Sequence, residues 1–399
     1  MIEQENFFTS NIFLFDSYSS VCEEILVSSN ISQEPEVAIK IKVDKNRPLH
    51  FAFGSKIGLV RLNLDGSIAE GNILGKLVSI PPNSIHEYMA FFDRNGFLLP
   101  IAYDKSEIIS ITELQALVDR LHATMVLLST IADTSMASYE VITRMIFYHL
   151  FAPIVSIEFN NGKYKYHSDR HLYRTFLEEH KYAPRDERLN DTFNNADFTF
   201  SDSIASFSLN ADFVDSVLNG NPSDCKYETP VFQNVFTAYC ASRDGKAKTM
   251  LSINDFIFHF FFDVGIVDYV DLEIIHYVND EVHQESFSDK LKIAAINTAK
   301  YIIKEELESN LRRVRPTYNT SKLEPTWKID SLLSALYFGL FYMKPNLETY
   351  RRCANPKCRE FFLVPVSSRK KKYCCTACMN RTMAARKRAR DRVNAAHEQ

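Results

Sequence analysis

The chain has 399 residues, a net charge of −4, and a composition that is 46% hydrophobic and 13% aromatic. These values are typical of a globular protein with two or three domains and a substantial core. With only 11 glycines and no Walker-type or Rossmann-type glycine motif, the sequence argues against glycine-rich nucleotide loops. The first residues contain no apolar signal core, and the most apolar stretch, Phe256–Phe262, is far shorter than the roughly 20 residues of a membrane span. We therefore expect a cytoplasmic protein with no membrane segment.

The first hundred residues alternate short apolar runs with turn signals. Val37–Val43 alternates apolar and polar residues as a half-buried strand does. Leu64-Asp65-Gly66 and Asn95-Gly96 are typical hairpin turns between apolar runs. The pattern predicts a small antiparallel sheet, with one helix near residues 16–28.

After residue 110 the spacing of the apolar residues becomes helical. Ile111–Phe151 holds no glycine or proline, and it predicts one long helix or two shorter ones. Ile154–Phe159 and Lys163–His167 predict a second hairpin around an Asn-Asn-Gly turn. Residues 285–314 predict a further helix, which Pro316 cannot continue.

A short strand followed by a helix with an Asp or Asn cap recurs three times in this pattern. The side chain of such a residue accepts hydrogen bonds from N–H groups of the first helical turn. The recurrence indicates either a repeated strand–helix unit or a chance repetition of a common motif. The three strand and helix pairs are 163–167 with 171–180, 248–253 with 255–263, and 326–329 with 331–343.

The segment His167-Ser168-Asp169-Arg170-His171 contains the residue types of a catalytic triad. Triad members are assembled by the fold and not by adjacency in sequence, so a turn beside the hairpin is the better interpretation. His259, inside the apolar stretch, is interpreted as a buried histidine. We find no catalytic motif and expect that the protein is not an enzyme.

Four cysteines near the C-terminus form two close pairs, Cys353-x4-Cys358 and Cys374-x3-Cys378. Two such pairs are typical of a structural zinc ion with four protein ligands and no open coordination position. The spacing Cys375-x2-Cys378 also occurs in zinc sites, so Cys375 is an alternative to Cys374 as the third ligand. A redox-active cluster of the five cysteines is the alternative interpretation.

The residues around these cysteines predict a compact module. Asn355-Pro356 favours a tight turn within the first pair, and Phe361–Val364 predicts a strand. Thr376 can cap a helix that begins at Ala377, which places Cys378 in the first turn of that helix. This order of knuckle, hairpin and helix is treble-clef-like.

The motif Cys353-x4-Cys358, Tyr373-Cys374-Cys-x-x-Cys378-x-Asn380-Arg381 and Arg386-x-Arg388 resembles the CGNR-type zinc finger. That family stands at the C-termini of bacterial proteins regarded as transcription regulators, often behind a so-called ABATE domain. The resemblance covers about 45 of the 399 residues. It implies a zinc ion held by the four cysteines, a DNA-binding role and a bacterial source. Met379 stands in place of the family's glycine, and no ABATE motif is recognisable upstream.

The charge of the chain is divided unevenly. Residues 351–399 carry 14 lysines and arginines against 3 acidic residues, a net +11, while the preceding residues carry 32 against 47, a net −15. Such a division is typical of a chain with one end that meets a polyanion. A solubilising tail, or a tail that docks on the acidic body of the same chain, is the alternative.

On a helix that begins near Ala377, the basic residues surround the axis and do not form one stripe. This distribution favours contacts with phosphates from several sides over one base-reading face. The candidate nucleic-acid-binding residues are Lys370, Lys371 and Lys372 in the finger loop, and Arg381, Arg386, Lys387, Arg388 and Arg390 on the helix.

Together these patterns predict an α+β protein with three segments. Residues 1–105 form a β-rich region with antiparallel strands, 106–346 a helix-rich α+β body that senses a ligand or forms oligomers, and 347–399 the zinc finger with its basic helix. The expected function is that of a cytoplasmic bacterial DNA-binding regulator with a structural zinc ion. Two alternatives remain open: a finger that docks a protein partner, and a factor that binds RNA or the ribosome.

Overall fold

The computed structural model describes residues 11–28, 35–103, 105–132, 138–152, 154–159, 164–168, 198–201, 204, 206–209, 229–241, 248–278, 282–320, 323–344, 347–368 and 370–397. The chain forms two compact units. Unit 1 contains Met1–Ser135, Val155–Ser168 and Glu306–Gln399, and unit 2 contains Met136–Ile154 and Asp169–Glu305. Helices and small antiparallel sheets are mixed in both, which confirms the α+β prediction. Residues on both sides of positions 105 and 346, the predicted segment boundaries, belong to unit 1.

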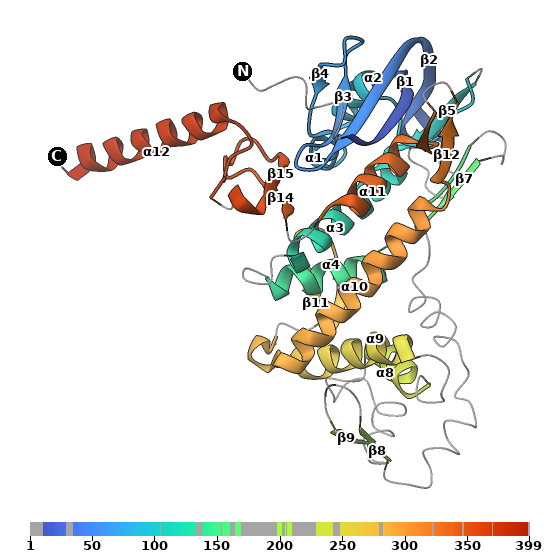
Figure 1. Ribbon diagram of the computed structural model, residues 1–399. Helices are drawn as coiled ribbons and strands as arrows, with labels where there is room; N and C mark the ends of the chain where they lie inside the picture. The colour runs from blue at the N-terminus through green and yellow to red at the C-terminus, as the bar shows by residue number, and fades with distance from the viewer. Residues whose placement is uncertain are drawn as a thin grey trace. The chain divides into compact units, whose positions relative to one another are not determined.

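The largest sheet lies in unit 1 (Figure 1). Its two long strands, β1 (Asn11–Ser28) and β2 (Pro35–Gly54), pair antiparallel from end to end, with irregularities between Asn11 and Phe13 and between Tyr18 and Ser19. The strands β3 (Gly58–Leu62) and β5 (Ser106–Ser110) pair with the two ends of β2 on its other side. Strand β4 (Ile68–Glu70) pairs with β3. The strand predicted at Val37–Val43 is confirmed as part of β2.

The helix predicted near residues 16–28 is wrong, because this segment is the second half of β1. Val21 and Ile25 lie four positions apart and imitate a helical repeat. Pairing with β2 supplies this segment with backbone hydrogen bonds along its whole length, and this tertiary context overrides the local pattern.

The two predicted hairpin turns have different outcomes. Gly66 lies in the turn between β3 and β4, where its N–H donates to the Asn63 carbonyl at 2.9 Å, so this turn is confirmed. Asn95-Gly96 instead ends helix α2 (Ile85–Asn95). Gly96 has a φ of 78° and donates its N–H to the Phe92 carbonyl, which is the usual role of glycine after a helix.

Helices and hairpins complete unit 1 around one apolar core. They are α1 (Ile73–Val78), α2, α3 (Ile111–Ala132), the hairpin β6–β7 (Ser156–Phe159 and Tyr164–His167), the hairpin β12–β13 (Arg315–Asn319 and Glu324–Lys328) and α11 (Leu332–Tyr342). Phe51, Phe92 and Tyr337 are fully buried in this core. The Arg120 guanidinium pairs with the Glu306 carboxylate inside it, and both side chains are almost completely buried.

Unit 2 is built from helices packed through phenylalanines. Its elements are α4 (Tyr139–Phe151), the hairpin β8–β9 (Phe198–Ser201 and Ser206–Leu209), α8 (Pro230–Ala241), α9 (Lys248–His259), a π-helical turn (Phe260–Val264), the hairpin β10–β11 (Val267–Val270 and Ile275–Tyr277) and a short 3-10 turn (Gln284–Ser286). Helix α10 (Asp289–Leu311) begins in this unit. The Phe147 ring lies 6.0 Å from Phe256 and 4.9 Å from Phe260, measured between centroids.

The structure confirms most of the predicted helices. The segment predicted as one or two helices forms α3 and α4, and the helix predicted at 285–314 forms α10. The second predicted hairpin is β6–β7. None of the helices described here is long and apolar enough to cross a membrane.

One of the three instances of the proposed strand–helix repeat has its predicted strand and helix. Strand β13 leads to α11, but the N-cap of α11 is Ser331 and not the predicted Asp330. The strand predicted at 248–253 is wrong, because this segment belongs to α9, where Ile253, Phe256 and Ile257 are buried at helical spacing. The helix predicted at 171–180 lies outside the residues described, as do Asp169, Arg170 and His171.

Candidate metal centre and basic helix

Four cysteine sulfurs lie within 4.8 Å of one another, those of Cys353, Cys358, Cys374 and Cys378. The Sγ atom of Cys374 is 3.6 Å from that of Cys358 and 3.6 Å from that of Cys378. Cys353 and Cys378 are buried, and the other two are half-buried. Such a set is close enough to hold a metal ion.

Two strands, a 3-10 turn, a loop and a helix bring the cysteines together. Cys353 directly follows β14 (Glu348–Arg352), and Cys358 precedes β15 (Phe361–Pro365). A 3-10 turn (Val366–Ser368) and a loop lead to Cys374. Helix α12 (Thr376–His397) carries Cys378 in its first turn. The strand predicted at Phe361–Val364 and the helix predicted from Ala377 are thereby confirmed.

Hydrogen bonds of the backbone fix the turn between the first two cysteines. The Cys358 N–H donates to the Asn355 carbonyl at 2.9 Å, and the Lys357 N–H donates to Asn355 Oδ1 at 3.2 Å. The Ala354 N–H donates to the Lys372 carbonyl at 2.8 Å, which holds this turn beside the loop before Cys374. The turn predicted from Asn355-Pro356 is confirmed.

The surroundings of the four thiols act on their pKa values in opposite directions. A hydrogen bond from the Asn355 side chain lowers the pKa of Cys378. Burial opposes ionisation of Cys353, but hydrogen bonds from the backbone of Cys374 and Asn355 outweigh it and lower the pKa of that thiol. Burial raises the pKa of Cys358 to about 11, and burial together with the three neighbouring thiols raises the pKa of Cys374. Four thiolates this close together would repel one another, and a bound cation would offset that repulsion and favour the ionised form of all four.

Cys375 lies outside the cluster of four. Its side chain is exposed, and its sulfur lies 3.9 Å from that of Cys374. Cys374, which precedes it, is half-buried and contributes its sulfur to the cluster.

The module has a very small apolar core. Phe362 and Val364 are buried with Cys353 and Cys378, and Tyr373 packs against them. A core of this size buries little apolar surface, so modules of this kind depend on a metal for their folding free energy.

The strand β15 docks on helix α1 of unit 1 (Figure 1). Asn72 Nδ2 donates to Glu360 Oε1 at 2.8 Å and to the Phe361 carbonyl at 2.6 Å. The Phe361 N–H donates to Ser79 Oγ at 2.8 Å. A Cβ atom at Gly75 would collide with the Phe361 carbonyl oxygen, so only glycine permits this approach.

The strand β14 docks on α3 and on the turn after β2. The Tyr350 N–H donates to Ser129 Oγ at 3.1 Å. Glu348 is buried, and its carboxylate accepts hydrogen bonds from the N–H groups of Lys56 and Lys344 at 2.8 and 3.2 Å. The cysteine module is therefore packed into unit 1 and is not a separate compact unit.

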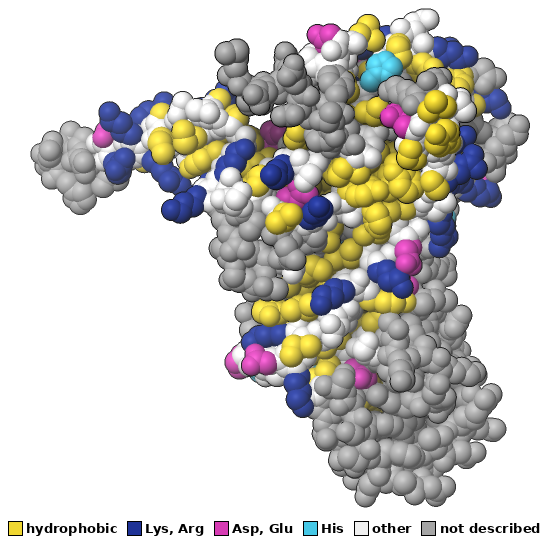
Figure 2. All heavy atoms as spheres, in the orientation of Figure 1, with side chains coloured by type: hydrophobic (Ala, Val, Ile, Leu, Met, Phe, Trp, Pro, Cys, Tyr) yellow, Lys and Arg dark blue, Asp and Glu magenta, His cyan; other side chains and the backbone are white. Residues whose placement is uncertain are grey.

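The first two turns of α12 contain buried residues, and the helix is exposed from Met383 to Asp391. Thr382 is buried, and its hydroxyl donates to the Cys378 carbonyl at 3.0 Å. From Met383 to Asp391 every side chain is exposed. Figure 2 shows lysine and arginine side chains gathered along this helix. The exposed candidate residues are Arg381, Arg386, Lys387, Arg388 and Arg390 on α12 and Lys370, Lys371 and Lys372 in the loop.

Two further basic side chains flank Cys358 and are not among the candidate residues named from the sequence. Lys357 and Arg359 are both exposed. Their positions next to a predicted ligand, together with their charge, were the signal available in the sequence. Arg359 also has a φ of 56°, which the sequence pattern did not indicate.

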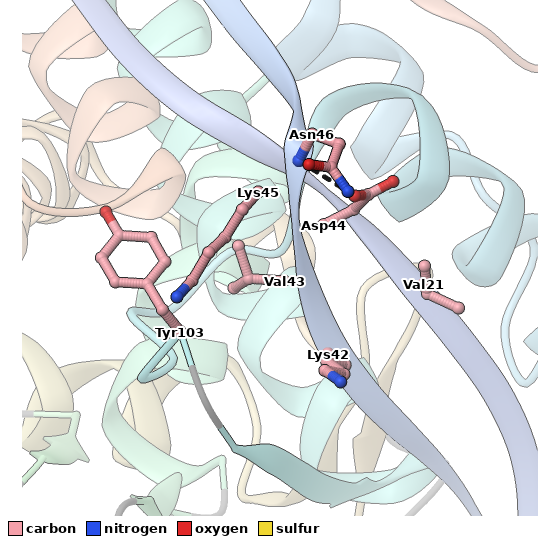
Figure 3. Close-up of a pocket in the computed structure, with 7 residues that line it drawn as sticks. All are labelled: Val21, Lys42, Val43, Asp44, Lys45, Asn46 and Tyr103. Carbon is pink, nitrogen blue, oxygen red and sulfur yellow. Dashed lines mark hydrogen bonds between the residues drawn. The ribbon is translucent and has the colours of Figure 1, made fainter.

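A separate surface hollow of about 550 Å³ lies along β1 and β2 (Figure 3). It is lined by Val21, Lys42, Val43, Asp44, Lys45, Asn46 and Tyr103. The Asp44 carboxylate accepts the Asn46 N–H at 3.1 Å, and Lys45 Nζ lies 5.3 Å from the Tyr103 ring centroid. Local contacts therefore engage Asp44 and Lys45.

A comparison of the chain with models of protein families, with curated proteins and with solved structures finds no match.

Proposed function

We propose that this protein binds duplex DNA through a C-terminal zinc finger, in which a structural zinc ion anchors a basic helix. The observation that carries this proposal is the exposed, strongly basic helix α12 that rises directly from a cluster of four cysteines. The CGNR-type motif supports the same role, and it suggests that the protein regulates transcription in a bacterial cytoplasm.

The geometry of the cysteines supports zinc as the metal. Zinc bound by four thiolates is tetrahedral with bonds of about 2.3 Å, which corresponds to sulfur–sulfur distances of about 3.8 Å. The two distances of 3.6 Å around Cys374 are close to this value, and all four sulfurs lie within 4.8 Å of one another. When bound, such an ion contributes folding free energy, with values on the order of 10–16 kcal/mol for small modules. Four protein ligands leave no position for a substrate, which favours a structural role.

The charge and shape of α12 support DNA as the partner. Its 22 residues span about 33 Å at 1.5 Å per residue, close to one turn of B-form DNA. An α-helix fits the major groove of B-form DNA, whereas the major groove of an RNA duplex is too narrow. Basic side chains on all sides of α12 would then reach phosphates on both walls of the groove.

Fluorescence anisotropy with duplex DNA at several salt concentrations tests the proposal. The full-length, zinc-loaded protein should bind at low salt, and its affinity should fall steeply as salt rises. The triple variant Arg386→Ala/Arg388→Ala/Arg390→Ala should lose most of the affinity. The matched control is Lys290→Ala/Lys300→Ala/Lys328→Ala, which removes three exposed charges elsewhere and should bind as the native protein does. No binding at low salt, or equal loss in both variants, would overturn the proposal.

A protein partner is the second candidate, because α12 exposes an apolar side chain among its arginines. Met383 is 58% exposed and lines a surface hollow together with Arg386, Ala389 and Arg390. A partner retained in pull-down after nuclease treatment, and lost in Cys358→Ser, would favour this function. Competition between duplex DNA and duplex RNA for the same protein separates the leading proposal from an RNA-binding role.

A further inference from the structure

The acidic side chains of residues 347–378 lie on the side of the finger that packs against the rest of unit 1. Residues 347–378 contain only two acidic side chains, Glu348 and Glu360. Glu348 is buried under hydrogen bonds from Lys56 and Lys344, and Glu360 accepts a hydrogen bond from Asn72. Both carboxylates are therefore occupied at the docked side. The exposed charged side chains that the structure describes within residues 347–378 are all basic.

Arg359 occupies a backbone conformation that favours glycine. Its φ of 56° lies in the left-handed region, directly after the half-buried Cys358. This conformation leads into Glu360, whose carbonyl accepts the Cys353 N–H at 2.9 Å. Glycine would adopt it without strain, whereas arginine adopts it at a cost. Strain of this kind at an exposed position points to a function of the side chain.

The fold does not use the Arg359 guanidinium. Among the residues described, the Arg359 and Lys357 side chains have no hydrogen-bond or ion-pair partner, and both are exposed. The hydrogen bond between Ala354 and Lys372 holds their turn beside the basic loop. We call the exposed basic side chains of these two adjoining loops, Lys357 and Arg359 in the turn and Lys370 and Lys372 in the basic loop, the knuckle surface.

We propose that the knuckle surface is a second phosphate-binding site, at which Arg359 and Lys357 contact the backbone of the same DNA duplex that α12 binds. This inference rests on the proposed function and adds residues to it. The cysteine cluster joins the two surfaces, because Cys358 borders the knuckle surface and Cys378 lies in the first turn of α12. Arginine suits this position because its guanidinium forms bidentate hydrogen bonds with a phosphate.

The variant Arg359→Gly provides a sharp test, since it removes the charge and at the same time relieves the backbone. Duplex affinity of the full-length, zinc-loaded protein is measured by anisotropy across a salt series. Each lost phosphate contact should lower the slope of log affinity against log salt by about 1. We expect a decrease of about 1 for Arg359→Gly and about 2 for Arg359→Gly/Lys357→Gln, with a several-fold loss of affinity at moderate salt. Zinc content should stay at one ion per chain in both variants.

Two comparisons make the result decisive. Arg359→Lys should keep the native slope because it retains the charge, and Lys328→Gln, which removes an exposed lysine far along the chain, should leave the slope unchanged. A native slope in Arg359→Gly/Lys357→Gln, alongside loss of binding in the α12 variant, would overturn the knuckle surface and leave the proposed function standing. Absence of DNA binding by the native protein would overturn both.

Discussion

Single residues differ in how far the sequence alone identifies their roles. Cys353, Cys358, Cys374 and Cys378 were identified correctly as one cluster because ligand spacing is local and specific to sulfur chemistry. The choice between Cys374 and Cys375 required the structure, because both residues have a spacing to Cys378 that suits a zinc site. In the structure Cys375 is exposed and Cys374 is half-buried. The left-handed backbone conformation of Arg359 could not be predicted from the sequence, because arginine is not a residue that is typical of this conformation.

Asp119 on α3 is a residue with consequences for stability that follow from its burial. Burial raises the pKa of Asp119 to about 6, from an ordinary value of 3.8, although its Oδ1 atom accepts a hydrogen bond from Gln115 Nε2 at 2.6 Å. The folded protein therefore retains a proton between about pH 4 and 6 that the unfolded chain releases. The free energy of unfolding falls as pH rises through this window, and the loss persists above it.

We expect Asp119→Asn to stabilise the protein at pH 7 by about 1–3 kcal/mol, because the neutral amide avoids this penalty and still accepts the hydrogen bond from Gln115. The difference from the native protein should vanish below pH 4. Urea denaturation at pH 4, 5, 6 and 7 measures both effects. Asp268→Asn, at an exposed aspartate, is the control and should change little. Equal stability of Asp119→Asn and the native protein at pH 7 would contradict this account.

At the scale of elements, the sequence predicted those whose periodicity agrees with their tertiary environment. Val37–Val43 alternates and pairs with β1, while Ala38–Lys42 within it also pairs with β5, and α3 has helical spacing and is mostly buried. The helix prediction for residues 16–28 failed because pairing with β2 decides the conformation of this segment, and the local sequence does not encode that pairing. The hairpin turn predicted at Asn95-Gly96 was wrong because Asn-Gly is equally common in hairpin turns and at the ends of helices, and here it ends α2.

The contact between α1 and β15 is a prediction at this scale. Gly75→Ala would place a Cβ atom against the Phe361 carbonyl oxygen and the Asn72 side chain, and the backbone atom cannot move aside easily. Overpacking of this kind costs about 1–3 kcal/mol, and loss of the hydrogen bonds from Asn72 adds to it. This exceeds the gain of about 1 kcal/mol in helix propensity. We expect a lower midpoint of chemical denaturation for the full-length, metal-loaded protein.

Gly71→Ala is the matched control for this change. A Cβ atom at Gly71 has nothing within 4 Å, so the same substitution four positions earlier should be nearly neutral. If both variants unfold at the same denaturant concentration, the close approach of α1 and β15 does not exist in solution.

The whole molecule shows what local patterns could not reveal, namely that the cysteine module is part of unit 1. Its docking joins Asn72 to Phe361 and Ser129 to Tyr350, pairs that lie 289 and 221 positions apart in the chain. Sequence periodicity carries no record of such pairs. The composition shift near residue 346 marks where the charge changes sign, and the contacts of unit 1 extend across it.

Because the cysteine module packs against the rest of unit 1, removal of the metal should weaken the contacts between the two. Without a cation, the four crowded thiols repel when ionised, and the small core around Phe362 and Val364 cannot hold the module alone. The Tyr350 and Phe361 N–H groups donate to Ser129 and Ser79 of unit 1, so their exchange with solvent reports on the docking. We expect chelation of the metal to accelerate hydrogen exchange at both amides by at least about 100-fold, since a loss of roughly 3 kcal/mol in local stability is sufficient for this.

Hydrogen–deuterium exchange of the full-length protein before and after chelation provides the measurement. Helix α9 of unit 2 is the internal reference, because its core of phenylalanines contains no part of the cysteine module. Its protection should stay constant, and restoring the metal should return Tyr350 and Phe361 to slow exchange. Unchanged protection at these two amides in the chelated protein would mean that the docked strands hold without a metal, and the cluster would then be dispensable for the placement of α12. Acceleration confined to the module and its contacts would establish that the ion fixes the basic helix to unit 1.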